Sequence, residues 1–138
     1  MAPVDSLEEL QRLLYATLKA DTAVMAIAGG VYDNVPTNPY AGKTAYISFG
    51  PVDTNEDDAE CINGLTITVQ IDIWSSAVGA VETKKLVGAV RKALHRKALT
   101  LTDNALVDIW VTVTRIIPDP AGIDHGIVTV SCMIEEPA

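Results

Sequence analysis

The sequence contains little cysteine and no long apolar run. Its two cysteines, Cys61 and Cys132, are too few for the disulfide-dense scaffold of a small secreted protein. We interpret both as free thiols, with a single disulfide as the alternative. No apolar stretch approaches the roughly 20 residues that span a bilayer. Acidic residues (Asp5, Glu8 and Glu9) stand where a signal peptide has basic ones. We therefore expect neither a membrane protein nor an exported one.

Basic residues are also scarce. The chain has 10 Lys and Arg against 18 Asp and Glu, a net charge of −8. A nucleic-acid-binding domain needs a basic footprint to displace counterions from phosphate. This balance therefore argues against specific nucleic-acid binding and against an anionic membrane surface. It favours a chain that stays in solution and repels its copies weakly.

Catalytic motifs are missing from the sequence. The only histidines, His95 and His125, have no Cys or His at metal-ligand spacing. No serine lies in a nucleophile elbow, and no phosphate-binding loop is present. We interpret Gly29-Gly30 as the end of a short helix, because glycine tolerates the left-handed conformation there. We expect no enzyme, no cofactor and no metal site.

The strongest pattern is the unbroken alternation of apolar and polar residues over 65–75. Successive side chains of a strand point to opposite faces, so this pattern predicts a strand with one face in the core. The length and the 49% apolar fraction suit one domain over residues 1–138. The core side of this strand is predicted to hold Leu65, Ile67, Val69, Ile71 and Ile73, and the other side Thr66, Thr68, Gln70, Asp72 and Trp74.

The remaining patterns predict further helices and strands. Helices are expected at 6–19, 22–27 and 78–97, and strands at 31–35, 44–49, 106–117 and 127–134. Asp5 or Ser6 begins the first helix, and residues 6–9 have the spacing of a capping box. Residues expected to face the core are Leu7, Leu10, Leu14 and Leu18, then Leu86, Val87, Val90, Ala93 and Leu94, then Val107, Ile109, Val111 and Val113, and finally Val128, Val130, Cys132 and Ile134.

Two amphipathic helices cover a sheet on one side only. We therefore predict an α+β fold with a mixed, largely antiparallel sheet and two main helices packed on one face. The opposite face is rich in threonine and carries Trp74 and Trp110. An acid precedes each tryptophan by two residues, which places the two indoles either as cross-strand neighbours or in equivalent rows. They are interpreted as subunit-interface anchors, or alternatively as side chains packed within the subunit.

Two charged segments stand out. Residues 53–60 hold five acids and no base, which predicts an exposed, mobile loop. A divalent cation and a neighbouring subunit are its alternative partners, although the spacing is not that of a calcium loop. The helix at 78–97 holds six of the ten basic residues. Its alternatives are a solvated face, a nucleic-acid helix, or pairing with the acidic surface of an adjacent subunit, and the acidic balance of the chain favours the last.

Six segments follow one another in order along nearly the whole chain and form a fairly specific set: Leu10–Asp21, Gly30–Pro36, Tyr46–Gly50, Ile73–Ser75, Val90–His95 and Asp119–Gly126. Together they resemble the family of small tail-completion proteins of long-tailed phages and gene transfer agents. The acidic run over residues 53–61 departs from what is typical of the family.

The resemblance implies a tail terminator without catalytic residues. Such a protein forms a ring, usually a hexamer, on the head-proximal end of the tail tube in a virion assembled in the bacterial cytoplasm. It stops tube polymerisation and meets the head-tail connector proteins, while DNA passes through the lumen without specific binding. The family's His-Gly pair is present as His125-Gly126, which we interpret as a tight start of the last strand. The alternatives are another neck component (a connector or stopper) and a small metal-binding module.

These inferences lead to two candidate surfaces. A ring requires two different patches that meet head to tail. Acidic side chains that face a DNA channel would repel phosphate and let DNA pass. The predicted subunit interface comprises Trp74, Trp110, Lys84, Lys85, Arg91, Lys92 and Arg96, and the predicted tube- or lumen-facing loop contains Asp53, Glu56, Asp57, Asp58 and Glu60.

Overall fold

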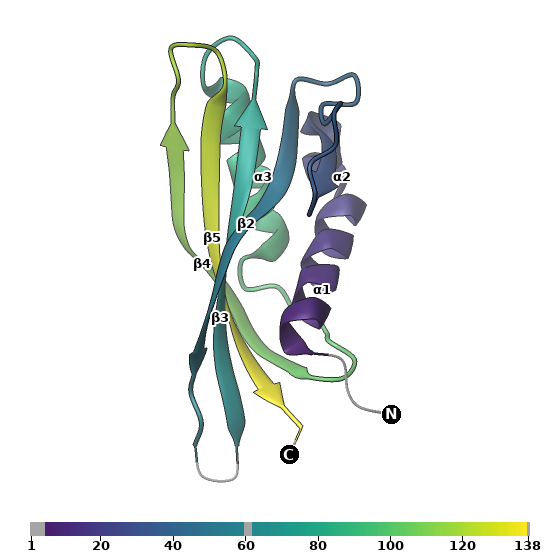
Figure 1. Cartoon of the computed structure of the whole chain (residues 1–138), viewed down its shortest axis with the longest axis vertical. Coiled ribbons are helices and arrows are strands. Elements are labelled where there is room, and N and C mark those ends of the chain that lie inside the picture. Colours follow the sequence, from purple (N-terminus) through teal and green to yellow (C-terminus); the bar gives the residue numbers. More distant parts are fainter. Residues whose placement is uncertain (1–4, 60–61, 138) are drawn as a thin grey trace.

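The computed structural model describes residues 5–59 and 62–137. It contains the helices α1 (Ser6–Ala20), α2 (Thr22–Ile27) and α3 (Val81–Leu94), and the strands β1 (Ala28–Tyr32), β2 (Ala45–Glu56), β3 (Asn63–Ser75), β4 (Ala105–Ile117) and β5 (Asp124–Glu136). The strands form one sheet in the order β1-β2-β3-β5-β4 (Figure 1). Only β1 and β2 are parallel, and the other neighbours are antiparallel. The predicted α+β class with a mixed sheet is confirmed.

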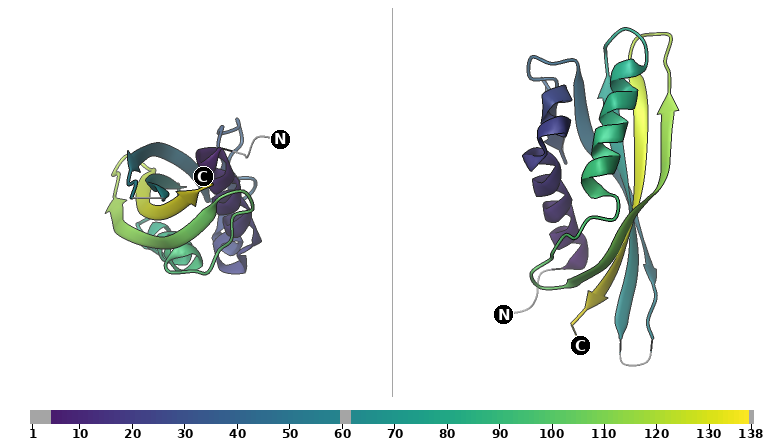
Figure 2. Two further views of the ribbon diagram at one scale, coloured as in Figure 1. Left: turned by 90° about the horizontal axis from the view of Figure 1, so that it is seen from below. Right: turned by 180° about the vertical axis from the view of Figure 1, so that it is seen from behind.

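Both long helices cover the same face of this sheet (Figure 2). α1 packs beside β1, and α3 packs over β3, β4 and β5. The apolar residues that β3 was predicted to turn inward are all buried, as are those of α3 and β5. Cys132 of β5 belongs to this core. Burial, and to a smaller extent the charge of Asp108, raises the pKa of the Cys132 thiol to about 12. The thiol therefore packs as a small neutral group, while Cys61 lies outside the described residues.

The start of α1 differs from the predicted capping box. Asp5 is the N-cap, and its side chain accepts a hydrogen bond from the Leu7 N–H at 2.9 Å. The Ser6 hydroxyl instead donates to the Glu136 carboxylate at 2.9 Å. Leu7 is 42% exposed, although the helical pattern assigned it to the core. The capping box was therefore wrong, because the Ser6 hydroxyl binds a residue of β5, whereas the alternative start at Asp5 is confirmed. The inward orientation of Leu7 was also wrong.

Glu9, the other half of the predicted box, holds a distant loop against α1. Its carboxylate accepts hydrogen bonds from the backbone N–H groups of Thr102, Asp103 and Asn104 at 2.8–3.2 Å, and from the Asn104 side chain at 3.1 Å. Burial alone would raise the pKa of Glu9. The hydrogen bonds, with that of Asp103 the largest, outweigh burial and leave the pKa below its usual range.

The two glycines predicted to end a helix lie instead in β1. A side chain at Gly29 would place its Cβ 1.8 Å from the carbonyl oxygen of Tyr40, and one at Gly30 would meet the Tyr32 hydroxyl at 2.2 Å. Gly29 therefore lets the loop at Tyr40 approach closely and Gly30 makes room for the ring of Tyr32, and neither has a left-handed backbone. The strand predicted at 31–35 was shifted by the same error and ends at Tyr32.

The acidic segment was predicted as a mobile loop, but much of it is strand. β2 continues to Glu56 and stays paired with β3 as far as the Glu56–Leu65 pair. The side chains of residues 53–59 are nevertheless exposed, as predicted. We call residues 52–59 and 62–69 of this hairpin the acidic arm. It extends past the helices at one end of the molecule (Figures 1 and 2). Glu60 lies outside the described residues.

The simple alternation predicted for β4 is wrong at two positions. β-Bulges lie between Leu106 and Asp108 and between Val111 and Val113, and each shifts the strand by one residue. Val107 is consequently 56% exposed and Val113 49% exposed, whereas Ile109 remains buried. The sequence pattern contains no sign of the bulges, because they depend on the pairing with β5.

Gly126 lies inside β5, which begins at Asp124, so it does not form the tight strand start that was predicted. A Cβ at Gly126 would lie 2.7 Å from Val87 Cγ2 and 2.9 Å from Thr83 Cγ2, both on α3. Gly126 therefore lets α3 approach the sheet closely. The helix itself is shorter than the predicted 78–97. It begins after Gly79, whose φ is +78°, and it ends at Leu94.

Candidate assembly surface

A row of aromatic side chains crosses the helix-free face of the sheet. We call Tyr32, Tyr40, Tyr46, Trp74 and His125 the aromatic row. Tyr46 lies at its centre, with ring centroids 6.1 Å from Tyr32, 5.0 Å from Tyr40 and 6.5 Å from Trp74. Burial, followed by the nearby Tyr40, raises the pKa of Tyr46. The five rings come from β1, β2, β3, β5 and one loop, so only the folded sheet brings them together.

The end of this row is held by polar contacts. Trp74 and His125 are directly opposite each other on β3 and β5, and their rings stack at 4.0 Å. The Trp74 indole N–H donates to Ser48 Oγ at 3.0 Å, and His125 Nε2 lies 2.7 Å from the largely buried Asp72 carboxylate. The Gln70 amide donates to the same carboxylate at 2.9 Å. Trp74 is thus held in one orientation by its neighbours within the chain.

Trp110 lies in a separate place on the same sheet. It is opposite Ser131, and β5 separates its strand from β3. The two tryptophans are therefore not cross-strand neighbours, and that alternative is wrong. The guanidinium carbon of Arg96 lies 5.7 Å from the Trp110 ring centroid, and Arg96 also forms an ion pair with Asp108. Arg96 and Trp110 thus contact each other within the subunit.

The acids that precede the two tryptophans have different partners. Asp72 contacts His125, whereas Asp108 contacts Arg96. His95 is the C-cap of α3. Its Nδ1 accepts a hydrogen bond from the Val111 N–H at 2.9 Å, so it joins the end of α3 to β4. Neither histidine lies in a cluster suited to a metal, and the described residues contain no group of three or more potential ligands.

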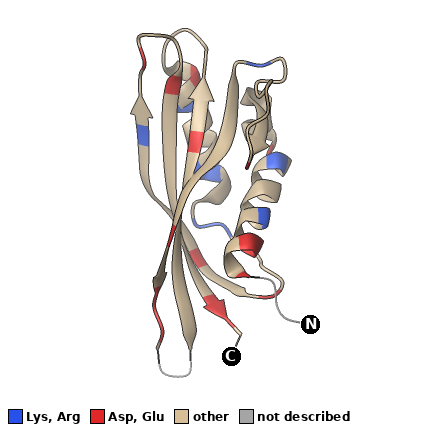
Figure 3. Cartoon of the chain, in the orientation of Figure 1, with Lys and Arg blue, Asp and Glu red and all other residues tan. Residues whose placement is uncertain are grey.

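The other basic residues of the predicted interface lie on the outer side of α3. Lys84, Lys85, Arg91 and Lys92 are all exposed. The N-terminal end of this helix is fixed to the sheet by Glu82, whose carboxylate accepts hydrogen bonds from Thr44 Oγ1 at 2.6 Å and Ser75 Oγ at 3.0 Å. We call these four cations, together with Val81 and Gly88, which lie between them on the helix surface, the basic face of α3. Figure 3 shows it well separated from the acidic arm.

The acids of the arm have few partners of their own. Asp58 Oδ1 accepts a hydrogen bond from the Gly64 N–H at 3.1 Å, and the Asp57 N–H donates to the Gly64 carbonyl at 2.9 Å. Asp58 therefore helps to close the turn. Asp53, Glu56 and Asp57 extend their carboxylates from exposed positions. The arm thus presents a concentrated negative charge at one end of the chain.

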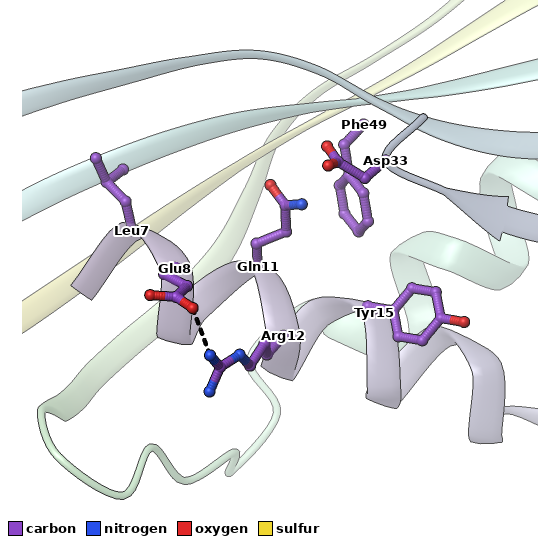
Figure 4. A pocket seen from close by; sticks show the side chains of 7 residues that line it. All are labelled: Leu7, Glu8, Gln11, Arg12, Tyr15, Asp33 and Phe49. Carbon is purple, nitrogen blue, oxygen red and sulfur yellow. Dashed lines mark hydrogen bonds and ion pairs between the residues drawn. The ribbon is translucent and has the colours of Figure 1, made fainter. Parts of the chain in front are cut away.

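A groove that the sequence did not predict runs between α1 and the root of the arm (Figure 4). Its volume is about 490 Å³, and its walls include Leu7, Tyr15 and Phe49 with Gln11 between them. Glu8 and Arg12 form an ion pair at its rim. Leu7 was assigned to the core, so no sequence signal separated this wall from buried residues. The mixed apolar and polar lining is typical of a surface that contacts another protein.

Comparisons with known proteins agree with this architecture. A family model described as "Tail completion protein gp17" matches residues 12–135. A chain in a solved structure entitled "Virion of native gene transfer agent (GTA) particle" superimposes with a TM-score of 0.84 at 27% sequence identity. The match covers 94% of this chain and 96% of that one. A comparison with curated protein sequences finds no match. No helix in the described part of the chain is long and apolar enough to cross a bilayer.

Proposed function

The chain belongs to the tail completion protein gp17 family, and from this membership we propose that it terminates a virion tail. It is a structural tail-completion protein and a component of a virion, in which it assembles with other tail and head proteins. In the proposed role, copies of the chain form a hexameric ring on the head-proximal end of the tail tube. The ring stops tube polymerisation and joins the tail to the head connector.

The observation that carries this proposal is the coextensive match to a chain in a gene transfer agent virion. It covers 94% of this chain and 96% of that one, so the whole fold, and not a shared fragment, is common to the two. A non-enzymatic role also suits the functional surfaces described above. Their conspicuous side chains are stacked aromatics and exposed charges, which recognise proteins and do not form a catalytic constellation.

Ring closure needs two different patches on each subunit. We propose that the helix-free face with Trp74 and Trp110 is one patch of the subunit interface. The basic residues Lys84, Lys85, Arg91, Lys92 and Arg96 at α3 and its C-terminal end form a separate patch of the same interface. Trp74 suits an anchor because its neighbours fix its orientation. Charged pairs across such a contact select the partner and the register more than they add affinity.

The acidic arm has a second proposed role at the lumen or the tube. Its exposed carboxylates would repel the phosphates of DNA, so that DNA passes without specific binding. Removing the arm should then leave the ring intact but impair tail capping. Capping that is unchanged by the deletion would contradict this role of the arm without affecting the ring.

The experiment that tests the function combines purified protein with tail tubes and with portal or adaptor proteins. A terminator binds the tube end and limits further polymerisation. Binding to portal or adaptor protein without binding to the tube would instead identify another neck component. Electron microscopy of tubes with and without the protein measures both the capped ends and the tube lengths.

A further inference from the structure

The basic face of α3 is organised as two parallel rows of cations. Residues seven apart lie almost above one another on a helix. Lys84 and Arg91 therefore form one row, and Lys85 and Lys92 the other. The line between these rows contains Val81 and Gly88. The outer face of α3 thus carries positive charge on both sides of this central line, which we call the trough, and at Gly88 the line has no side chain.

No close contact in the described part of the subunit requires a glycine at position 88. A Cβ built at this position would meet nothing within 4 Å. Glycine in a helix interior is less favourable than alanine, because it loses more backbone freedom on folding. Gly126 contrasts with it, because its missing side chain makes room for Val87 and Thr83. The space above Gly88 is therefore open in the isolated chain, and it would admit the backbone of a partner.

The acidic arm has the complementary arrangement of charge. Glu56 is opposite Leu65, whose side chain faces the helix side, whereas Asp53 is opposite Thr68 on the helix-free side. Cross-strand partners share a face of the sheet, so the two carboxylates point to opposite faces of the hairpin. A hairpin edge lying along the trough would therefore offer an acid to each cationic row.

Within one chain these two surfaces lie apart. The tip of the arm is at one end of the long axis, and α3 lies alongside the other half of the sheet (Figures 1 and 2). Among the described residues, the ion pairs that form involve none of Lys84, Lys85, Arg91 and Lys92. Two complementary patches at different ends of a subunit are what a head-to-tail contact between copies requires.

We propose that the acidic arm of one copy lies along the basic face of α3 in the next copy, with its edge over Gly88. The proposal rests on the ring of the proposed function and names its head-to-tail contact. It gives the arm a partner inside the ring, whereas the role at the lumen or the tube leaves ring closure independent of the arm. Deletion of the arm separates the two roles, because this contact predicts that the deletion dissociates the ring. A second copy fits this face better than nucleic acid does, because the same chain carries a net charge of −8 that repels phosphate.

A charge-swap experiment tests this contact. One variant reverses the helix (Lys84→Glu, Lys85→Glu, Arg91→Glu and Lys92→Glu), and another reverses the arm (Asp53→Lys, Glu56→Lys and Asp57→Lys). Asp58 is kept because it holds the turn. Each variant alone should lose about tenfold or more in its association constant, because several exposed pairs become repulsive. A chain with both reversals, or an equal mixture of the two variants, should regain association.

Lys19→Glu serves as the matched control, since it reverses an exposed cation on α1 away from both surfaces. Circular dichroism melting establishes that every variant is folded. Gly88→Gln adds a test independent of charge. It should raise the melting temperature of the subunit through helix propensity and yet weaken association. If Gly88 had no role in association, Gly88→Gln would raise the melting temperature and leave the association constant unchanged.

The mass of each variant, measured by light scattering, decides the outcome. Restored association in the doubly reversed chain supports the contact. A doubly reversed chain that stays dissociated, or a helix-reversed chain that associates like the wild type, overturns it. If the wild type itself forms the ring in those cases, the ring closes through other surfaces and the proposed function stands. A wild type that never associates overturns the contact alone, and the tube-capping experiment then decides the proposed function. Binding of DNA by the wild type but not by the helix-reversed variant would also overturn the contact and would assign the face to nucleic acid.

Discussion

Trp74 and His125 stack face to face across β3 and β5, with ring centroids 4.0 Å apart and planes only 6° from parallel. The same imidazole lies 2.7 Å from the Asp72 carboxylate, which is 7% exposed. One side chain therefore satisfies a buried acid and also fixes the orientation of the tryptophan. These two contacts explain what the histidine of the His125-Gly126 pair does in the fold.

Replacing His125 should loosen that arrangement. His125→Ala removes the stacked ring and one partner of Asp72, and we expect a loss of about 1–3 kcal/mol in the free energy of unfolding. The fluorescence of Trp74 should shift to the red as water reaches the indole. Urea unfolding and emission spectra measure the two effects, with Trp110→Phe as a background that isolates the Trp74 signal. Unchanged stability and emission would show that the stack contributes nothing.

Glu9 should make the stability depend on pH in acid. Its pKa is lowered in the folded chain, so its contribution is present above the pKa of the unfolded state and is lost as the pH falls through the folded pKa. Glu9→Gln should lower the unfolding free energy near neutral pH, because an amide accepts fewer hydrogen bonds from the 102–104 loop. The gap between wild type and variant should narrow as the pH falls through the acidic range. If the difference in unfolding free energy between wild type and Glu9→Gln stayed constant with pH, the role given to the Glu9 carboxylate would be contradicted.

The two glycines near α3 should respond in opposite directions to the same substitution. Gly126→Ala forces a Cβ against Val87 and Thr83, and overpacking of this kind costs about 1–3 kcal/mol. Gly88→Ala meets no atom and should stabilise the subunit by about 0.5–1 kcal/mol. Thermal melting of the dissociated subunit compares the pair directly. Equal changes in stability for Gly126→Ala and Gly88→Ala would show that close packing against the sheet does not distinguish the two glycines.

Trp110→Ala tests the proposed interface on β4. Trp110 is half-buried and contacts Arg96 within the subunit, so some loss of stability is expected. If Trp110 is an interface anchor, its loss weakens association by about 2 kcal/mol or more while the subunit stays folded. Light scattering measures the association, and thermal melting of the same variant measures the stability lost with the Arg96 contact, so the two effects are read separately. A variant that unfolds, or one that associates normally, would count against the anchor.

Patterns of local period were enough to predict most of the fold. The alternation in β3 and the apolar stripe of α3 placed the core correctly, because a buried face must repeat with the period of its element. The sequence could not predict what depends on pairing between distant strands. The bulges of β4, the extension of β2 to Glu56 and the close approach at Gly29 all follow from neighbours that are remote in sequence.

The candidate surfaces show the same division. Trp74, His125 and the cations of α3 attract attention one by one, since large aromatics and clustered charge are visible in any sequence. That Trp74 meets His125, and that Arg96 covers Trp110, requires the strand order β3-β5-β4. The groove beside α1 was missed because Leu7 fits the apolar stripe of the helix, although it is exposed and lines the groove.

The most direct test of the central claim is the solution mass of the purified protein, measured by light scattering over a wide range of concentrations. A ring held by contacts between copies of the chain predicts a discrete species near six times the 14.7 kDa of one chain. That mass should persist on dilution before it falls to the mass of the subunit. A single species of 14.7 kDa at every concentration would contradict a ring that closes through its own contacts.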